Sequence, residues 1–153
     1  MIPECKQIFL PNPALPVEAQ EDLVLLGMCL WGEARGEPKE AQVGVAWVVK
    51  NRVEHPRWWG KTLKEVILMP YQFSCFLARD PNYRKILYPL KSESAEVWDE
   101  CYLTGCEVMS GAIPDHTGGA DHYFDTSILP PKWATSGKKT LDIGRLQFYR
   151  IYI

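Results

Sequence analysis

Glu33 is the residue whose type and position most clearly suggest chemistry. It continues a line of leucines at helical spacing, Leu23, Leu26 and Leu30, on one face of a predicted helix. A helix with that face inward carries the carboxylate to the edge of the core. Partial burial disfavours the charged form and raises the pKa of a carboxyl group, as a general acid near neutral pH requires. The position therefore makes Glu33 a candidate general acid.

The acidic residues of this region also have plainer interpretations. Glu33 can be a solvated helix-end residue, or one paired with Arg35 or Arg52, because most glutamates lie on the surface. Glu37 lies just beyond Gly36 and suits the first turn of a following helix, where an acid interacts favourably with the helix dipole. A role for Glu37 in substrate binding is the alternative.

The first half of the chain contains clear helix signals. The helix that carries the leucines should end at Gly36, and the next should begin at Pro38. The segment 41–53 (AQVGVAWVVKNRV) is apolar enough for a buried strand or a buried helix, and its length favours a helix. Thr62 and Glu65 have the spacing of a capping box, which predicts a short helix after them.

The second half changes character. Residues 71–79 (YQFSCFLAR) indicate an irregular segment rich in aromatics, and residues 92–104 indicate a helix that Gly105 terminates. Glycines and prolines then cluster around short β-type runs, which predict strands at 122–124 and 146–153. These elements predict an α+β fold, a mostly helical domain with a small antiparallel β element in the C-terminal third.

Length and composition describe one globular domain. The chain has 153 residues, of which 46% are apolar and 24% charged, and these values exclude a disordered chain. Residues 1–17 carry four prolines and predict an extended arm, so the folded domain is expected to span residues 18–153. We expect a monomer.

Charge and hydropathy argue against several kinds of partner. A net charge of −2 with scattered basic residues gives no electrostatic footprint for nucleic acid. No run approaches the roughly 18 apolar residues that a membrane-spanning helix needs. Residues 1–10 lack a basic start followed by an apolar core, so we expect synthesis in a cytoplasm without a signal peptide. The five irregularly spaced cysteines predict no disulfide framework, and most are expected to be small buried hydrophobes.

Several motifs occur in the order found in one family of enzymes. The blocks are 32–38 (GEARGEP), 42–46 (QVGVA), 51–53 (NRV), 72–74 (QFS), 119–124 (GADHYF), 131–134 (PKWA), and 143–144 (IG) with 148–149 (FY). Together they resemble the SleB-type cell-wall hydrolases, named for the spore cortex-lytic enzymes. The resemblance spans about residues 22–150, and the first block is its most specific part.

The resemblance implies a compact lysozyme-like domain that acts on peptidoglycan. It implies cleavage between N-acetylmuramic acid and N-acetylglucosamine by lytic transglycosylation, which leaves a 1,6-anhydro end, and it maps the catalytic glutamate to Glu33. One carboxyl group can act first as acid and then as base, unlike the two carboxylates of ordinary glycosidases. Hydrolysis at the same site is the alternative reaction. Leu146 stands where members often carry a histidine, so the chain departs from the family there.

Aromatic and polar residues of these motifs are the predicted substrate-binding residues. Sugar rings present apolar C–H faces that pack on flat side chains, which favours Phe73, Tyr123 and Trp133 along a groove, although Phe73 can instead be a core residue. Gln72 and Ser74 can hydrogen-bond acetamido groups or only cap a loop. The predicted substrate-binding set is Glu37, Gln72, Phe73, Ser74, His122, Tyr123 and Trp133, whereas Trp47, Trp58, Trp59 and Trp98 are expected to be packing residues.

Two other classes of function stay open. A cysteine amidase or peptidase needs Cys29 as nucleophile and His116 or His122 as base, but reactive thiols usually lie at exposed helix starts and Cys29 falls inside an apolar helix. A zinc amidase needs three ligands, and the histidines include no pair at i and i+4, so we predict no metal and no cofactor. A glycan-binding module without catalysis would use the same aromatics.

The route to the substrate follows from the expected place of synthesis. A bare catalytic domain made in the cytoplasm resembles a phage endolysin, which would reach the cell wall through a holin-type pore. Peptidoglycan is therefore the expected partner.

Overall fold

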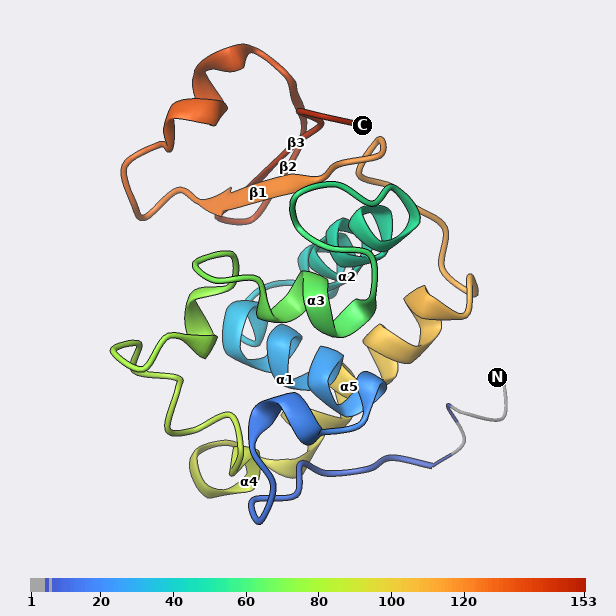
Figure 1. Ribbon diagram of the computed structural model, residues 1–153, viewed down its shortest axis with the longest axis vertical. Helices are drawn as coiled ribbons and strands as arrows, with labels where there is room; N and C mark the ends of the chain where they lie inside the picture. Colours follow the sequence, from blue (N-terminus) through green and yellow to red (C-terminus); the bar gives the residue numbers. More distant parts are fainter. Residues whose placement is uncertain (1–4, 6) are drawn as a thin grey trace.

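The computed structural model describes Cys5 and residues 7–153 (Figure 1). Its elements are, in chain order, η2 (Val17–Ala19), α1 (Asp22–Ala34), α2 (Lys39–Glu54), α3 (Leu63–Leu68), η3 (Ser74–Phe76), α4 (Pro89–Ser92), α5 (Ala95–Met109), β1 (His122–Asp125), η4 (Lys132–Ser136), β2 (Lys139–Ile143) and β3 (Leu146–Tyr149), where η marks a 3-10 turn. The strands gather at one end of the molecule, next to α2. This arrangement confirms the predicted α+β fold.

Helix α1 is the centre of the core. Its residues from Val24 to Trp31 are all buried, and it packs most extensively on α5. Leu26 and Leu30, two of the leucines that lead to Glu33, are fully buried. A Cβ atom at Gly105 of α5 would lie 3.0 Å from Leu26 Cδ2. The prediction that Gly105 ends its helix is wrong, because this glycine permits close packing on α1 and α5 continues beyond it.

The helix boundaries in the first half follow the sequence signals closely. Helix α1 ends at Ala34, just before its predicted end, and Pro38 is the N-cap of α2. Segment 41–53 lies within α2, which confirms the helix prediction. The capping box is also confirmed: the Thr62 hydroxyl accepts from the Glu65 N–H, and the Glu65 carboxylate accepts from the Thr62 N–H.

The three strands form an antiparallel sheet in the order β1-β3-β2. The predicted strand 146–153 is too long, because β3 ends at Tyr149 and the N–H groups of residues 151–153 donate to the Asp121 carboxylate instead of to a strand. Strand β2 was not predicted. Its residues are mostly exposed, although residues 140–143 do alternate polar and apolar side chains as a half-buried strand does.

Contacts with α2 fix the position of the sheet. A Cβ atom at Gly44 would lie 2.6 Å from Phe148 Cζ, so glycine is required for β3 to pack on this helix. The Asn51 amide donates to the Ala120 carbonyl and to the Asp115 carboxylate, each at 3.0 Å. These bonds hold the loop that enters β1. The helix therefore determines where the residues of β1 lie.

The N-terminal segment lies against α5. The Trp98 indole N–H donates to the Phe9 carbonyl at 2.9 Å, and the Gln20 side chain bonds the Asn12 backbone. Residues 1–4 and 6 of the predicted arm lie outside the described residues. The division of the chain at residues 17 and 18 stays a prediction.

Candidate active site

Glu33 lies in the last turn of α1, and groups from two distant segments donate hydrogen bonds to its carboxylate. The Tyr123 hydroxyl, on β1, donates to Oε1 at 2.8 Å. The Cys75 backbone N–H and the Ser74 hydroxyl, both in η3, donate to Oε2 at 3.1 Å and 3.3 Å. We call this arrangement the Glu33 cradle: Glu33 with Tyr123, Ser74 and Cys75. It joins the predicted acid to two residues of the predicted substrate-binding set, Tyr123 and Ser74, through hydrogen bonds that were not predicted.

The Glu33 carboxyl is held partly away from water without a compensating positive charge. The residue is half-buried. Burial raises the pKa of Glu33 above its ordinary value of 4.5, and the hydrogen bonds from Tyr123, Cys75 and Ser74 offset only part of that effect. Among the residues that the structure describes, no lysine, arginine or histidine forms an ion pair with Glu33. A raised pKa extends the pH range in which the group can donate a proton.

The arginines considered as partners of Glu33 are engaged elsewhere. The Arg35 guanidinium lies 4.0 Å from the centre of the Trp31 ring, and its Nε lies 3.8 Å from the Glu93 carboxylate. Arg52 donates to other groups, which are described below. The interpretation of Glu33 as a salt-bridged surface residue is therefore wrong.

Close backbone packing lets η3 reach Glu33. A Cβ atom at Gly32 would lie 2.6 Å from the Cys75 Cβ, so any larger residue would push η3 away from α1. Just before η3, Tyr71 adopts a φ of 67°, a left-handed conformation that is uncommon outside glycine. The segment that carries Ser74 and Cys75 is thus placed by a glycine and by an unusual turn.

A groove of about 320 Å³ lies beside the Glu33 cradle and shares Tyr123 with it. This size is near the lower end of the range for ligand sites, roughly 300–1,000 Å³. Five predicted substrate-binding residues line it: Gln72, Phe73, His122, Tyr123 and Trp133. The other lining residues are Arg52, Trp58, Tyr71, Phe124, Ile128, Pro131 and Tyr152. None of these described residues is acidic. Three larger hollows, two beside the N-terminal segment and one at the start of α2, contain none of the predicted site residues.

The predicted aromatic residues differ in how much surface they offer. Phe73 is only 3% exposed, so it belongs to the core as well as to the groove wall. Tyr123 and Trp133 are half-buried, as expected of groove residues. The Trp133 ring centre lies 4.8 Å from that of His122, which is itself buried. Trp58 was expected to be a packing residue, but it is 48% exposed and lines the groove, so that prediction is wrong.

Glu37 is not brought to the groove. Its Oε1 accepts from the Arg145 backbone N–H at 3.2 Å, and its Oε2 lies 3.7 Å from the Arg145 Nε. Arg145 lies in the turn between β2 and β3, so Glu37 ties the α1–α2 loop to the sheet. Substrate binding by Glu37 stays a prediction, while its observed contacts are structural. Leu146, at the position of the family histidine, is buried in the core.

Arg52 is a site residue that the sequence prediction missed. It is 4% exposed, and burial lowers its pKa to about 10. Its Nε donates to the Asp121 carbonyl at 2.8 Å, and its Nη1 donates to the Gln72 Oε1 at 3.1 Å. Gln72 leads into η3 and Asp121 leads into Tyr123, so one guanidinium braces both segments of the Glu33 cradle. The sequence signal that could have found Arg52 is its place in the motif at 51–53 (NRV).

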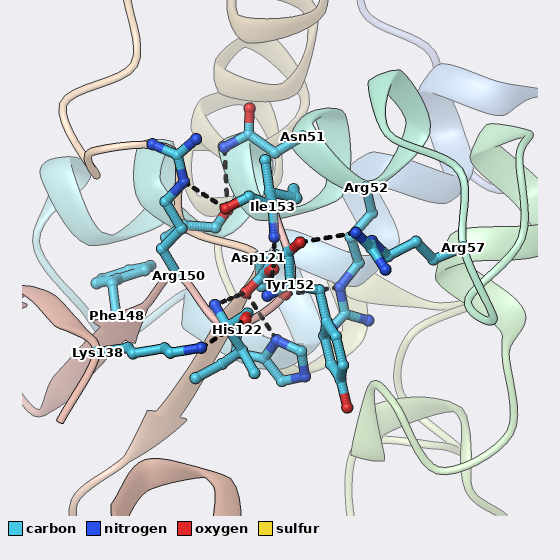
Figure 2. A network of polar contacts seen from close by, with 12 residues as sticks. Asn51, Arg52, Arg57, Asp121, His122, Lys138, Phe148, Arg150, Tyr152 and Ile153 are labelled. Atoms are coloured by element: carbon cyan, nitrogen blue, oxygen red, sulfur yellow. Dashed lines mark hydrogen bonds and ion pairs between the residues drawn. The ribbon is translucent and has the colours of Figure 1, made fainter. Parts of the chain in front are cut away.

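Asp121 is fully buried and bonds two residues of the groove wall, His122 and Tyr152 (Figure 2). Its carboxylate accepts hydrogen bonds from His122 at 2.9 Å and from the backbone N–H groups of residues 151–153 at 2.7–3.1 Å. Burial raises the pKa of Asp121, but the hydrogen bonds from His122, Ile151 and Tyr152 outweigh it and lower the pKa to about 2. Asp121 is therefore a permanent anion that positions its neighbours.

The cysteine amidase or peptidase alternative depends on the Cys29 thiol. Cys29 is fully buried, and burial raises the pKa of its thiol well above 9.0, which contradicts a nucleophilic role. All five cysteines are buried and free, as predicted. In Cys5 and residues 7–153, no group of three or more His, Cys, Asp or Glu residues could hold a metal ion. No helix in the same residues is long and apolar enough to cross a membrane.

Residues 36–149 match the family model described as Cell Wall Hydrolase, so the chain belongs to this family. The family relation expected from the motifs is thereby confirmed. The matched span begins just after Glu33. The assignment of Glu33 as the acid therefore depends on its geometry and on the motif at 32–38.

Similar proteins include spore cortex-lytic enzymes. That of Oceanobacillus iheyensis is 28% identical over 129 residues, which cover 83% of this chain and 41% of the relative. That of Bacillus cereus is 29% identical over 133 residues, covering 83% and 43%. The chain thus spans about two-fifths of the length of these relatives.

Solved structures of two catalytic domains share the fold. The catalytic domain of the germination-specific lytic transglycosylase SleB from Bacillus anthracis has 26% identity and a TM-score of 0.66, covering 92% of this chain and 100% of that one. The catalytic domain of the Bacillus cereus SleB protein has 26% identity and a TM-score of 0.65, covering 92% and 95%.

Proposed function

We propose that this chain cleaves the glycan strand of peptidoglycan between N-acetylmuramic acid and N-acetylglucosamine as a lytic transglycosylase. Glu33 is the acid and base of the reaction. The Glu33 cradle carries the proposal, because it holds one carboxyl group of raised pKa beside an aromatic groove. The names of the similar structures and relatives, a lytic transglycosylase and spore cortex-lytic enzymes, support the substrate class.

The reaction needs one carboxyl group and no water. Protonated Glu33 donates its proton to the glycosidic oxygen as the bond from that oxygen to C1 breaks, and the leaving sugar departs with a hydroxyl group. The Glu33 carboxylate then removes the proton from the C6 hydroxyl of the muramic sugar. The C6 oxygen bonds to C1 and closes the 1,6-anhydro ring. Tyr123, Ser74 and the Cys75 N–H stabilise the carboxylate between the two steps.

The remaining site residues bind and position the strand in this proposal. Phe73, Tyr123 and Trp133 pack against sugar rings, and Gln72 and His122 supply polar contacts from the same groove wall. The proposed catalytic domain is residues 18–153, which follow the N-terminal arm.

Mass spectrometry of digested peptidoglycan tests the proposed reaction. A 1,6-anhydro end and a reducing end differ by one water, so the products identify the chemistry directly. We expect anhydro products from the native chain and none from Glu33→Gln. Reducing-end products would instead show a hydrolase. Released peptides would show an amidase or peptidase, and wall binding without soluble fragments would show a glycan-binding module.

The endolysin role stays a prediction with its own test. The chain is expressed in a susceptible host with and without a holin-type pore protein. Lysis that requires the pore supports release of an enzyme made in the cytoplasm. Lysis without the pore contradicts it.

A further inference from the structure

Three exposed aromatic side chains of the groove take no part in the Glu33 cradle, namely Trp58, Tyr71 and Tyr152, and two of them, Trp58 and Tyr152, pack on each other. Trp58 is 48% exposed and Tyr152 is 45% exposed, and both line the groove that Tyr123 shares with Glu33. Each ring therefore offers a flat apolar surface to a ligand in the groove. Neither residue belongs to the motif blocks quoted from the sequence, and Tyr152 lies beyond the matched residues 36–149.

The turn that carries Trp58 is rigidly built. Its neighbour Trp59 is fully buried, and the Trp59 indole N–H donates to the Arg52 carbonyl at 2.9 Å. Gly60 closes the turn with a φ of 105°, where a Cβ atom would lie 2.6 Å from the Glu65 Cβ. Trp59 therefore anchors the turn in the core, and Trp58 remains in the groove wall.

The position of Tyr152 is also fixed by hydrogen bonds (Figure 2). Its backbone N–H donates to Asp121 at 2.7 Å, and its carbonyl accepts from Arg57 Nη2 at 2.8 Å. The Arg57 guanidinium also lies 5.6 Å from the centre of the Tyr152 ring. Because Arg57 directly precedes Trp58, these contacts tie the last residues of the chain to the turn that carries the tryptophan.

The two rings meet at nearly a right angle. The centres of the Trp58 and Tyr152 rings are 6.3 Å apart with an interplanar angle of 80°. The centre of the His122 ring lies 6.3 Å from that of Trp58 and 5.8 Å from that of Tyr152, so His122 is a neighbour of both rings. These contacts hold Trp58 and Tyr152 in place before a ligand binds, which lowers the entropy lost when a ligand packs against them.

We infer that Trp58 and Tyr152 form a second sugar-binding position, separate from the Phe73–Tyr123 pair beside Glu33. Its ligand is an N-acetylhexosamine ring further along the same glycan strand, whose apolar C–H face packs on the exposed indole. Gln72, which lines the same groove, supplies a polar contact to this ring. The inference rests on the proposed function, because it names a further contact of the same substrate.

A second position has a measurable consequence for substrate length. A strand that reaches both positions gains the packing on Trp58 and Tyr152, and a disaccharide that occupies only the position beside Glu33 does not. An aromatic contact of this kind contributes on the order of 1 kcal/mol, which corresponds to about a fivefold change in the dissociation constant.

Binding of peptide-free glycan strands to the Glu33→Gln protein tests the inference. The dissociation constants of a long strand and of a disaccharide are measured by calorimetry, alone and with Trp58→Ala or Tyr152→Ala added. We expect each addition to weaken binding of the long strand about fivefold and to leave the disaccharide unchanged. Trp58→Phe keeps a flat ring and should retain most of the affinity.

Tyr83→Ala is the matched control, because Tyr83 is 39% exposed and lies outside the groove. Circular dichroism establishes that each variant is folded, and Tyr152→Leu replaces Tyr152→Ala if the smaller side chain unfolds the protein. Long-strand binding that is equal in the Trp58, Tyr152 and Tyr83 variants overturns the inference alone. Failure of the Glu33→Gln parent to bind any glycan overturns the proposed function and the inference with it.

Discussion

Two carboxyl groups beside the same groove are held by hydrogen bonds and yet have opposite pKa shifts. The Asp121 side chain has no exposed surface, but the hydrogen bonds from His122, Ile151 and Tyr152 outweigh the burial and lower its pKa to about 2. Glu33 accepts hydrogen bonds from two hydroxyl groups and a single backbone N–H. The effect of burial exceeds the effect of these hydrogen bonds, so the pKa of Glu33 is raised. The balance between burial and the hydrogen bonds from donors therefore decides which carboxyl group stays ionised.

The difference in pKa separates a structural carboxyl group, Asp121, from the proposed catalytic one, Glu33. Asp121 stays charged, so it can hold the chain end and His122 in place at any pH near neutrality. Glu33 is the group poised to exchange a proton, which is the property of a catalytic acid. The two are linked by Arg52 and by β1, because Asp121 leads directly into the strand that carries Tyr123.

The largest expected effect comes from Glu33→Gln. We expect cell-wall cleavage to fall about a thousandfold, within the range for loss of a general acid. Stability should be unchanged or higher at pH 7, because a folded-state pKa raised above the unfolded value means that ionised Glu33 opposes folding at neutral pH. Turbidity clearing of wall suspensions and thermal unfolding measure the two effects. A variant that keeps a tenth of the activity, or that melts well below the native chain, contradicts this view.

Asp121→Asn should have the opposite signature, with stability lost first. The carboxylate accepts hydrogen bonds from the backbone N–H groups of residues 151–153, and the NH2 group of an asparagine would face some of these donors without bonding them. We therefore expect about 3 kcal/mol of destabilisation and a melting temperature roughly 10 °C lower. Asp142→Asn is the control, since its ion pair with Lys139 is exposed and should matter little. Equal melting temperatures for the two variants would remove Asp121 from its structural role.

Acid titration of stability should sharpen the same contrast. The folded pKa of Asp121 lies near 2 and its ordinary value is 3.8, so its contribution is fully present above pH 3.8 and is lost as the pH falls toward 2. The contribution is about 2 kcal/mol. Chemical unfolding at pH 5 and pH 2 measures it, with Asp121→Asn as the reference that lacks this term. A native chain and variant with the same pH dependence would contradict the prediction.

The smallest effect is a shift of the pH profile in Tyr123→Phe. The Tyr123 hydroxyl lowers the pKa of Glu33, so its removal should raise that pKa further. Activity that requires protonated Glu33 then extends to higher pH, and the alkaline limb of kcat/KM moves upward by less than about one pH unit. A limb that moves to lower pH shows that Tyr123 acts in another way.

Local signals explain what the sequence predicts correctly. The capping box at Thr62 depends on residues three positions apart, and the leucines that lead to Glu33 follow the helical period. Such features form in the same way in almost any context. They place Glu33 in the last turn of α1, at the edge of the core, and predict α2 as the next helix.

Long-range contacts explain what the sequence does not reveal. Arg52 braces Gln72 and Asp121, and Asp121 accepts from N–H groups about thirty residues further along the chain. Gly105 has the residue type of a helix end, and only its packing on Leu26 shows its role. The exposed strand β2 and the groove face of Trp58 likewise depend on what lies across from them.

A carbon-13 NMR titration of the Glu33 side-chain carboxyl tests the central claim most directly. The signal is identified by its absence from the Glu33→Gln spectrum. A titration midpoint above the ordinary value of 4.5 is the predicted result, because burial outweighs the hydrogen bonds of the Glu33 cradle. A midpoint at or below 4.5 would show a carboxylate that is stabilised rather than poised to donate a proton, and would contradict the assignment of Glu33 as the acid.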